Sequence, residues 1–524
     1  MDGAGLERSA SISGMATTHR AAGAVHVSPL DKFFDITKRK STPAREVRGG
    51  LVTFFTMVYI LALNPIIVGT TTDINGNLIS GMKPTDPNAI PITMAMVAAA
   101  TALVAAVSSI LMGVLGRFPI ALATGLGINS MAAYVIAPKM TWGSVMGLIV
   151  WEGIVVTILV VTGVREAIFR AVPKELRIAI SVGIGLFIAF IGLIDAGVIR
   201  AGSGTITTLG VNGSLLGWPI LVFVVGLFLM IFLYSRHVKG SILIAILAMT
   251  VVAIVITKVA NVPAMTDATG AVVHATGWAS NVPAWVPGSL HLPDLGLLGR
   301  VDMIGGFQTF TQGANGVFTA SGVTMGSLLS GVLIAFSLLL ADFFDTVGTV
   351  VAVGAEAGLL DKTGEPPRLR EILLADSLGA VLGGLGSVSS NTSYVESSAG
   401  VAEGSRTGLS SVVTGIMFAL AIFLSPLFGM VPAEAVAPAL VLVGFLMLTQ
   451  VAEIPWQDLE RGLPAYLAVI FMPFAYSITN GIGVGFISYV LLKVFHRKAK
   501  DIHPLMWVTS ILFVLYFLQG LLIK

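Results

Sequence analysis

The sequence predicts an all-α membrane protein in which fourteen spans form a 7+7 inverted repeat. Composition is the first observation: of the 524 residues, 55% are hydrophobic and only 11% are charged, and the mean hydropathy is +0.91. Soluble domains carry about 25% charged residues. The second observation is the recurrence of apolar segments of about 20 residues, the length that crosses a bilayer. The third is a pair of similar segments that lie seven spans apart.

Fourteen apolar segments reach or approach spanning length, and a span can be shorter than about 20 residues where its backbone breaks. They cover residues 50–70, 91–115, 119–137, 143–163, 174–198, 216–235, 240–257, 327–352, 371–388, 391–403, 409–429, 433–452, 463–478 and 482–495. A further apolar run covers 504–523. The pattern leaves open whether this run is another crossing or a helix at the membrane interface.

Basic residues gather in alternate loops, and these loops mark the cytoplasmic side. The clusters precede the first span and follow the fourth, sixth, eighth and fourteenth; they contain Lys38, Arg39, Lys40, Arg45, Arg48, Arg165, Arg170, Lys174, Arg177, Arg236, Lys239, Lys362, Arg368, Arg370, Arg497, Lys498 and Lys500. Segment 258–325 has few basic residues, as an external loop should. Residues 1–48 begin without an apolar core segment, so we expect a cytoplasmic tail rather than a signal peptide.

An internal repeat supports the topology. Val172-Pro173-Lys174-Glu175 opens the fifth span, and Val431-Pro432-Ala433-Glu434 opens the twelfth. Because the two copies are offset by seven spans, an odd number, they have opposite orientations in the membrane. Inverted repeats of this kind are typical of secondary transporters, which bind their substrates near the bilayer midplane.

The eighth span carries two acids in an apolar setting. Asp342, Asp345 and Thr349 are spaced i, i+3 and i+7, so they share one helical face. A charge at the bilayer centre costs about 2.5 to 3.5 kcal/mol on insertion scales, so such acids usually have a function. Phe343 is placed either for packing or for stacking on a flat ligand. The structural alternative for the two carboxylates is a hydrogen bond to a neighbouring helix.

Two spans are poor membrane helices. The third contains Thr124, Gly125 and Asn129, and the tenth contains the run 389–400 with Glu396. They occupy corresponding positions in the two repeats, and their backbone groups need partners from protein or from a polar cavity. Asn129 and Glu396 are the polar side chains that such a cavity would present.

Three further polar positions are weaker candidates. Asp376 lies early in the ninth span, and structural and functional roles are equally open for Glu152 in the fourth. Asn64-Pro65 is expected to kink the first span.

Several function classes lack their signatures. All seven histidines lie outside the spans, and there is no cysteine. A coupling proton must therefore be carried by carboxylates, and no base–nucleophile pair indicates an enzyme. The chain has no phosphate-binding loop and no metal-spaced cluster, so we expect no metal and no cofactor other than a coupling ion. A net charge of +2 gives no indication of nucleic acid binding, and the expected environment is the lipid bilayer.

Together these motifs resemble the nucleobase–cation symporter-2 superfamily, and within it the AzgA-like purine permeases. The resemblance covers residues 30–523 and is carried by Leu30-Asp31-Lys32-Phe33-Phe34, Thr53-Phe54-Phe55-Thr56-Met57-Val58-Tyr59-Ile60 with Asn64-Pro65, Gly127-Ile128-Asn129, Asp342-Phe343-Phe344-Asp345-Thr346-Val347-Gly348-Thr349 and Tyr394-Val395-Glu396-Ser397. Each motif alone is weakly specific, whereas the combination is highly specific.

The resemblance implies a UraA-like fold with a core and a gate domain. The core domain would comprise residues 49–163 and 326–430, and the gate domain 164–257 and 431–524, with 258–325 as an external loop. Spans three and ten would contain short antiparallel strands. Members of the family import adenine, guanine or hypoxanthine with protons.

The resemblance also implies roles for individual residues. Asn129, Asp342 or Asp345, and Glu396 would bind substrate, with Gly127 as a small position beside the site. The carboxylates of Glu396, Asp342 and Asp345 are the expected proton carriers, and Phe343 and Thr349 complete the predicted site. The uracil and xanthine branches usually place one acid on this span, so the alignment is ambiguous here, and we favour Asp342 as the substrate-facing acid.

The sequence thus predicts a proton-coupled importer of purine nucleobases in a bacterial inner membrane, with its N-terminus in the cytoplasm. Alternatives are a transporter of xanthine or uracil, or an anion carrier of the same fold, although acids disfavour an anion site. A channel or a membrane enzyme fits less well. Dimers are common in the superfamily, which leaves a homodimer open.

Overall fold

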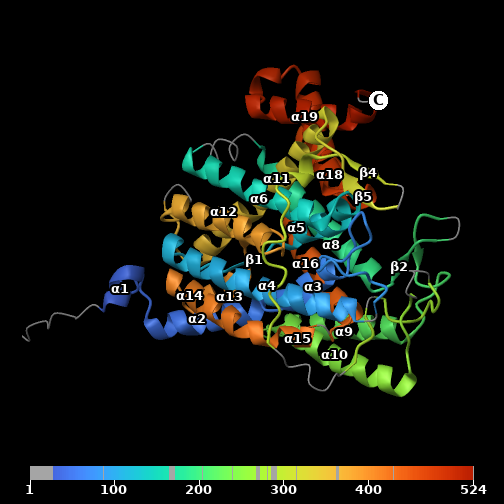
Figure 1. Cartoon of the computed structure of the whole chain (residues 1–524). Helices are drawn as coiled ribbons and strands as arrows, with labels where there is room; N and C mark the ends of the chain where they lie inside the picture. The colour runs from blue at the N-terminus through green and yellow to red at the C-terminus, as the bar shows by residue number, and fades with distance from the viewer. Residues whose placement is uncertain are drawn as a thin grey trace, which may run out of the picture.

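The structure is a computed structural model of the full chain. It describes residues 28–522 with gaps at 87, 164–171, 203–204, 239, 267–271, 280, 285–291, 314–315, 362–364 and 429. Most of the first tail and the basic residues Arg165, Arg170, Lys239 and Lys362 therefore lie outside the described residues. The described part is built mainly from helices (Figure 1).

Ten helical segments of the described chain are long and apolar enough to cross a membrane. They are Pro43–Gly69 (α2, Pro43–Met57, and α3, Ile60–Gly69), Ala89–Gly116 (α4, Ala89–Leu111, and its extension), α6 (Trp142–Val161), α8 (Lys174–Asp195), α9 (Trp218–Ser235), α10 (Ser241–Ala260), Met325–Phe343 in α11 (Met325–Glu356), Gly408–Phe428 (α14, Gly408–Ala421, to α15, Ser425–Phe428), Ala433–Glu453 (α16, Ala433–Leu448, and its extension) and α18 (Ile478–Phe495).

The four other predicted spans are not among these ten helical segments, for two reasons. The ninth and thirteenth are α12 (Leu369–Leu385) and α17 (Leu459–Phe474), which are helical but only 17 and 16 residues long. The third and tenth are broken, as predicted from their polar residues. The count of fourteen spans therefore stays a prediction. The C-terminal α19 (Pro504–Leu522) packs against α18, with the rings of Phe513 and Phe486 6.0 Å apart.

The two broken spans meet in a buried strand pair. β1 (Leu122–Thr124) runs antiparallel to β6 (Asn391–Ser393), in the register Leu122–Ser393 and Thr124–Asn391. A short helix follows each strand: α5 (Leu126–Ser130), which continues as a wider helix to Ile136, and α13 (Ser397–Ala402). The prediction of short antiparallel strands in these two spans is confirmed.

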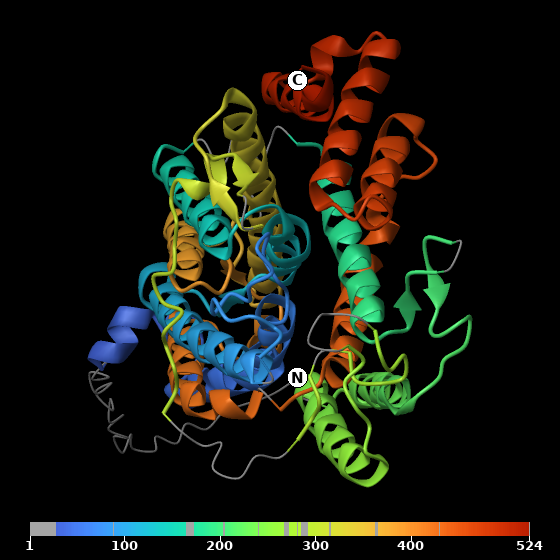
Figure 2. The ribbon, with the colours of Figure 1, turned by 45° about the vertical axis from the view of Figure 1, so that its right-hand side comes forward.

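The helices form two neighbouring groups. α8 packs on α16, α17 and α18, and the teal-green α8 runs beside these orange-red helices on the right of Figure 2. α4 packs on α14, α3 and α12, and α12 packs on α6. Glycine allows close approach of α8 and α16, because a Cβ at Gly185 would lie 3.0 Å from the carbonyl oxygen of Gly444. These groups contain the helices expected in the gate and the core, respectively.

Two small hairpins lie outside these bundles. β2 (Ile199–Arg200) pairs with β3 (Thr208–Leu209) between α8 and α9, and β4 (Phe310–Gln312) pairs with β5 (Phe318–Ala320) just before α11. The second hairpin belongs to the long segment predicted as an external loop.

The N-terminal segment is fastened to the loop between α13 and α14. It begins with α1 (Pro29–Phe34). Arg39 donates from Nη1 to the carbonyl oxygens of Arg117 (2.7 Å) and Arg406 (3.1 Å). The fully buried carboxylate of Glu46 accepts from the backbone N–H groups of Arg406 (2.8 Å) and Thr407 (3.2 Å). The segment thereby holds the end of the tenth span in place.

Candidate functional site

The strand pair β1–β6 is the frame of the candidate site. Beyond its ladder, the N–H of Gly125 donates to the carbonyl oxygen of Ser390 (2.9 Å), and the N–H of Tyr394 donates to that of Ala121 (3.0 Å). The hydroxyl of Tyr394 also donates to the carbonyl oxygen of Thr124 (2.7 Å). These bonds satisfy the irregular backbone inside the protein, as a membrane interior requires.

Glu396 lies just after β6 and is held by the first span. Its Oε1 accepts a hydrogen bond of 2.5 Å from the hydroxyl of Tyr59. Thr56 donates to its backbone carbonyl oxygen at 3.4 Å. Tyr59 is buried at the break between α2 and α3. Sequence reasoning did not select Tyr59 as a site residue, although it belongs to the first-span motif that carries the resemblance.

Asn129 lies on α5 and is also tied to the first span. Its amide nitrogen donates to Oδ1 of Asn64 (2.8 Å), and both residues are fully buried. The amide nitrogen of Asn64 in turn donates to Oγ1 of Thr101 (2.8 Å) and to the carbonyl oxygen of Val388 (3.1 Å). Asn64 was expected only to mark a kink, whereas the structure makes it the partner of a predicted site residue.

The two acids of the eighth span lie in different surroundings on α11. Asp345 is exposed, and its Oδ2 accepts from the hydroxyl of Thr392 on β6 (3.3 Å). Asp342 is fully buried in the helix bundle. Thr349 is buried two turns beyond Asp342, and Phe343 packs within the main hydrophobic core. The structure therefore connects Asp345, rather than the favoured Asp342, to the strand pair.

Two further buried acids hold β6. Oδ1 of Asp376 on α12 accepts from the hydroxyls of Thr346 and Ser393, both at 2.9 Å. Oε2 of Glu152 on α6 accepts from the hydroxyl of Ser390 at 3.3 Å. Both carboxylates are at most 1% exposed. Two of the three weaker sequence candidates, Asp376 and Glu152, therefore contact β6 or the residue just before it.

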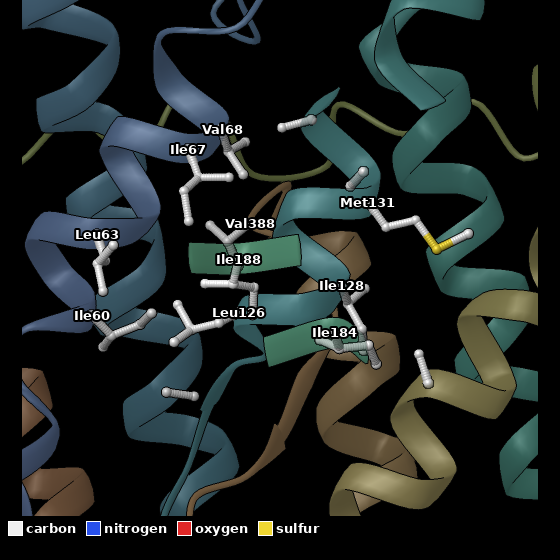
Figure 3. Close-up of a cluster of buried hydrophobic side chains, with 14 of the residues drawn as sticks. Ile60, Leu63, Ile67, Val68, Leu126, Ile128, Met131, Ile184, Ile188 and Val388 are labelled. Atoms are coloured by element: carbon white, nitrogen blue, oxygen red, sulfur yellow. The ribbon is translucent and has the colours of Figure 1, made fainter. Parts of the chain in front are cut away.

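Apolar side chains form the contact between α5 and α8. Leu126 and Ile128 of α5 lie beside Ile184 and Ile188 of α8 in Figure 3. A Cβ added at Gly127 would lie 2.7 Å from Cγ2 of Ile184, so a larger residue would require Ile184 to shift. The small position predicted beside the site is thus a contact between the two helix groups.

The site offers oxygen ligands but no metal cluster. Across the described ranges, no group of three or more His, Cys, Asp or Glu residues is arranged to hold a metal ion. The available groups are carboxylates, amides and hydroxyls, which suit hydrogen bonding to a neutral polar molecule.

Comparisons with known proteins identify a matching family and similar relatives. The model of the Permease family (Xan_ur_permease) matches residues 44–484. Adenine permease AdeP of Escherichia coli (strain K12) is 36% identical over 488 residues, covering 93% of this chain and 95% of the relative. Guanine/hypoxanthine permease PbuG of Bacillus subtilis (strain 168) is 36% identical over 491 residues, covering 93% and 99%.

Solved structures show the same fold at low sequence identity. The transmembrane domain of the cyanobacterial bicarbonate transporter BicA aligns with a TM-score of 0.53 and 14% identity, covering 83% of this chain and 97% of that one. Murine Slc26a9, an anion transporter in its inward-facing state, aligns with a TM-score of 0.54 and 12% identity, covering 93% and 77%. These similarities concern the fold alone, and they confirm the predicted fold class.

Proposed function

Since this chain belongs to the Permease family represented by Xan_ur_permease, the nucleobase–cation symporter-2 family, we propose that it imports purine nucleobases together with protons. The relatives that support the purine assignment are named adenine permease and guanine/hypoxanthine permease, and they match over almost the whole chain.

The observation that carries the proposal is the arrangement of polar groups around β1–β6. Asp345 contacts Thr392 of β6, Glu396 lies just after β6 and accepts from Tyr59, and Asn129 follows β1. Purines are flat and present N–H donors along their edges, whereas carboxylate and amide oxygens accept such donors. A site whose polar groups must be paired discriminates strongly against ligands that leave them unpaired.

Asp345 is our choice for the eighth-span acid that meets the purine. It is exposed and contacts β6, whereas Asp342 is buried within the helix bundle. Asp342 then has a supporting role on the same helical face.

The proposed coupling uses carboxyl groups, because all seven histidines lie outside the candidate spans. A protonated carboxyl group of Glu396 or Asp345 and the purine bind from outside. The core then moves relative to the gate, and both are released into the cytoplasm. The basic loops support a cytoplasmic N-terminus. The bacterial inner membrane and a homodimer stay predictions.

Uptake by proteoliposomes tests the function. We expect labelled adenine, guanine or hypoxanthine to accumulate when the outside is acidic, and a protonophore to abolish the accumulation. Uptake undiminished by the protonophore would overturn proton coupling, and no uptake of any of the three purines would overturn the substrate assignment. Labelled bicarbonate tests the anion-carrier alternative in the same vesicles.

A matched pair of variants connects the function to the site. Glu396→Gln removes the titratable group, and we expect it to lose proton-driven uptake. Glu453→Gln is the control, because Glu453 is an exposed acid paired with Lys174 at 2.9 Å. Full proton-driven uptake by Glu396→Gln would remove Glu396 from the coupling mechanism.

A further inference from the structure

The first span contacts both halves of the candidate site. Tyr59 and Asn64 lie within the single segment Pro43–Gly69. Tyr59 donates to Glu396, which belongs to the second repeat, and Asn64 accepts from Asn129, which belongs to the first. The span is therefore placed to orient the polar groups on both sides of the strand pair.

A chain of hydrogen bonds fixes which way the Asn64 amide faces. The carbonyl oxygen of Val388 can only accept, so the Asn64 atom 3.1 Å from it must be the amide nitrogen. The opposite atom of that amide, Oδ1, then faces Asn129 and can only accept. For this reason Asn129 turns its amide nitrogen toward Asn64, at 2.8 Å.

The consequence is a free acceptor on Asn129. Its nitrogen is engaged by Asn64, so its Oδ1 lies on the other side of the amide group. This oxygen is buried and has no hydrogen-bond partner in the part of the chain that the structure describes. Buried polar atoms normally have partners, so an unpaired acceptor beside the proposed site is a place for a ligand N–H donor.

We propose that Asn64 is a positioning residue that locks the Asn129 amide with its oxygen free, so that the site requires an N–H donor from the purine at this position. The inference rests on the proposed function and adds the hydrogen-bonding polarity of the site. A ligand that presents a lone pair there would face the Asn129 oxygen and leave it unpaired.

The test compares purines that differ in their donors and acceptors. KM is measured in proteoliposomes for adenine, guanine, hypoxanthine and unsubstituted purine. The discrimination ratio is the quotient of the largest and the smallest of these four KM values in the wild type, and the same two ligands are compared in every variant. In Asn64→Ala the amide of Asn129 is free to rotate and can present either its oxygen or its nitrogen to the ligand. We therefore expect the discrimination ratio to decrease about tenfold, which corresponds to about 1.4 kcal/mol. A general loss of structure would instead weaken all four ligands alike.

Three further variants separate positioning from stability. In an Asn129→Ala background, adding Asn64→Ala should leave the ratio unchanged, because the residue acts through Asn129. Thr101→Val removes one partner of Asn64 but keeps its bond to Val388, so the wild-type ratio should persist. Asn64→Asp in its protonated form can donate to the carbonyl oxygen of Val388 and keep its other oxygen facing Asn129, so it should also retain the ratio. It serves if Asn64→Ala does not reach the membrane.

The outcomes are distinct from those that test the proposed function. If no purine is taken up by wild type, the proposed function fails. If the wild type takes up purines and Asn64→Ala keeps the wild-type discrimination ratio, whatever its level of uptake, the proposed positioning role of Asn64 is contradicted. The same conclusion follows if the ratio changes equally with and without Asn129.

Discussion

The hydroxyl of Tyr59 lies 2.5 Å from Oε1 of Glu396, so the first span donates directly to the acid that follows β6. The two residues come from opposite repeats and are separated by 337 positions in the chain. Their contact joins the start of one half of the protein to the centre of the other.

Tyr59→Phe tests this contact. Phenylalanine keeps the buried ring but removes the donor, and hydrogen bonds to charged groups contribute about 1.5 to 3 kcal/mol. We expect KM for the transported purine to rise by about tenfold or more, measured in vesicles with matched protein content. Tyr489→Phe on the partly buried face of α18 is the control, and an equal effect of both variants would contradict a specific role for Tyr59.

Asp376 provides a second test, because one of its oxygens fixes both Thr346 and Ser393. Asp376→Ala leaves two buried hydroxyls without this acceptor, at about 1 to 3 kcal/mol for each group. We expect a lower midpoint of thermal unfolding in detergent and little uptake. Asp376→Asn retains an acceptor oxygen at the same position, so it should be milder, and equal losses in both variants would show that the charge, not the acceptor, is needed.

Gly127→Ala tests the contact between α5 and α8. The added Cβ would lie 2.7 Å from Cγ2 of Ile184, and overpacking of this kind costs about 1 to 3 kcal/mol. We expect reduced uptake. Ile184→Ala removes the opposing methyl group, so the double variant should recover part of the loss. A double variant worse than either single variant would mean that the two positions do not meet in the working cycle.

Glu46→Ala tests the fastening of the N-terminal segment. The variant leaves the N–H groups of Arg406 and Thr407 without their acceptor, at about 1 to 3 kcal/mol each when buried. We expect a clear fall in unfolding temperature. Glu403→Gln is the comparison, because Arg48 of the Arg48–Glu403 pair (3.0 Å) is largely exposed and exposed pairs contribute about 0 to 1 kcal/mol. Similar shifts in both variants would contradict the buried role of Glu46.

The broken spans illustrate what sequence can predict. Polar residues in the third and tenth apolar segments predicted irregular backbone there, and the resemblance predicted strands, both of which the structure contains. Local composition sufficed because a membrane interior tolerates irregular backbone only where protein satisfies it. The ninth and thirteenth segments were predicted at nearly the observed lengths of α12 and α17, although both helices begin and end two to four residues earlier than predicted.

The hydrogen-bond partners could not be predicted in the same way. Helical spacing placed Asp342 and Asp345 on one face, but the packing of α11 decides that Asp345 contacts Thr392 while Asp342 is buried. Tyr59 and Asn64 were visible only as parts of a motif and a proline kink. Their partners lie far away in the chain, so the pairing depends on tertiary contacts that no local pattern encodes.

The register of β1 with β6 has a consequence for biogenesis. Tyr394 donates to Thr124 across 270 residues, so the third span must enter the membrane long before its strand partner has been synthesised. Contacts this far apart in sequence form slowly, because the loop between them must close first. We therefore expect the polar edge of β1 to stay unpaired in the nascent chain until the tenth span arrives. During this interval the protein depends most on its insertion machinery and is most exposed to quality control.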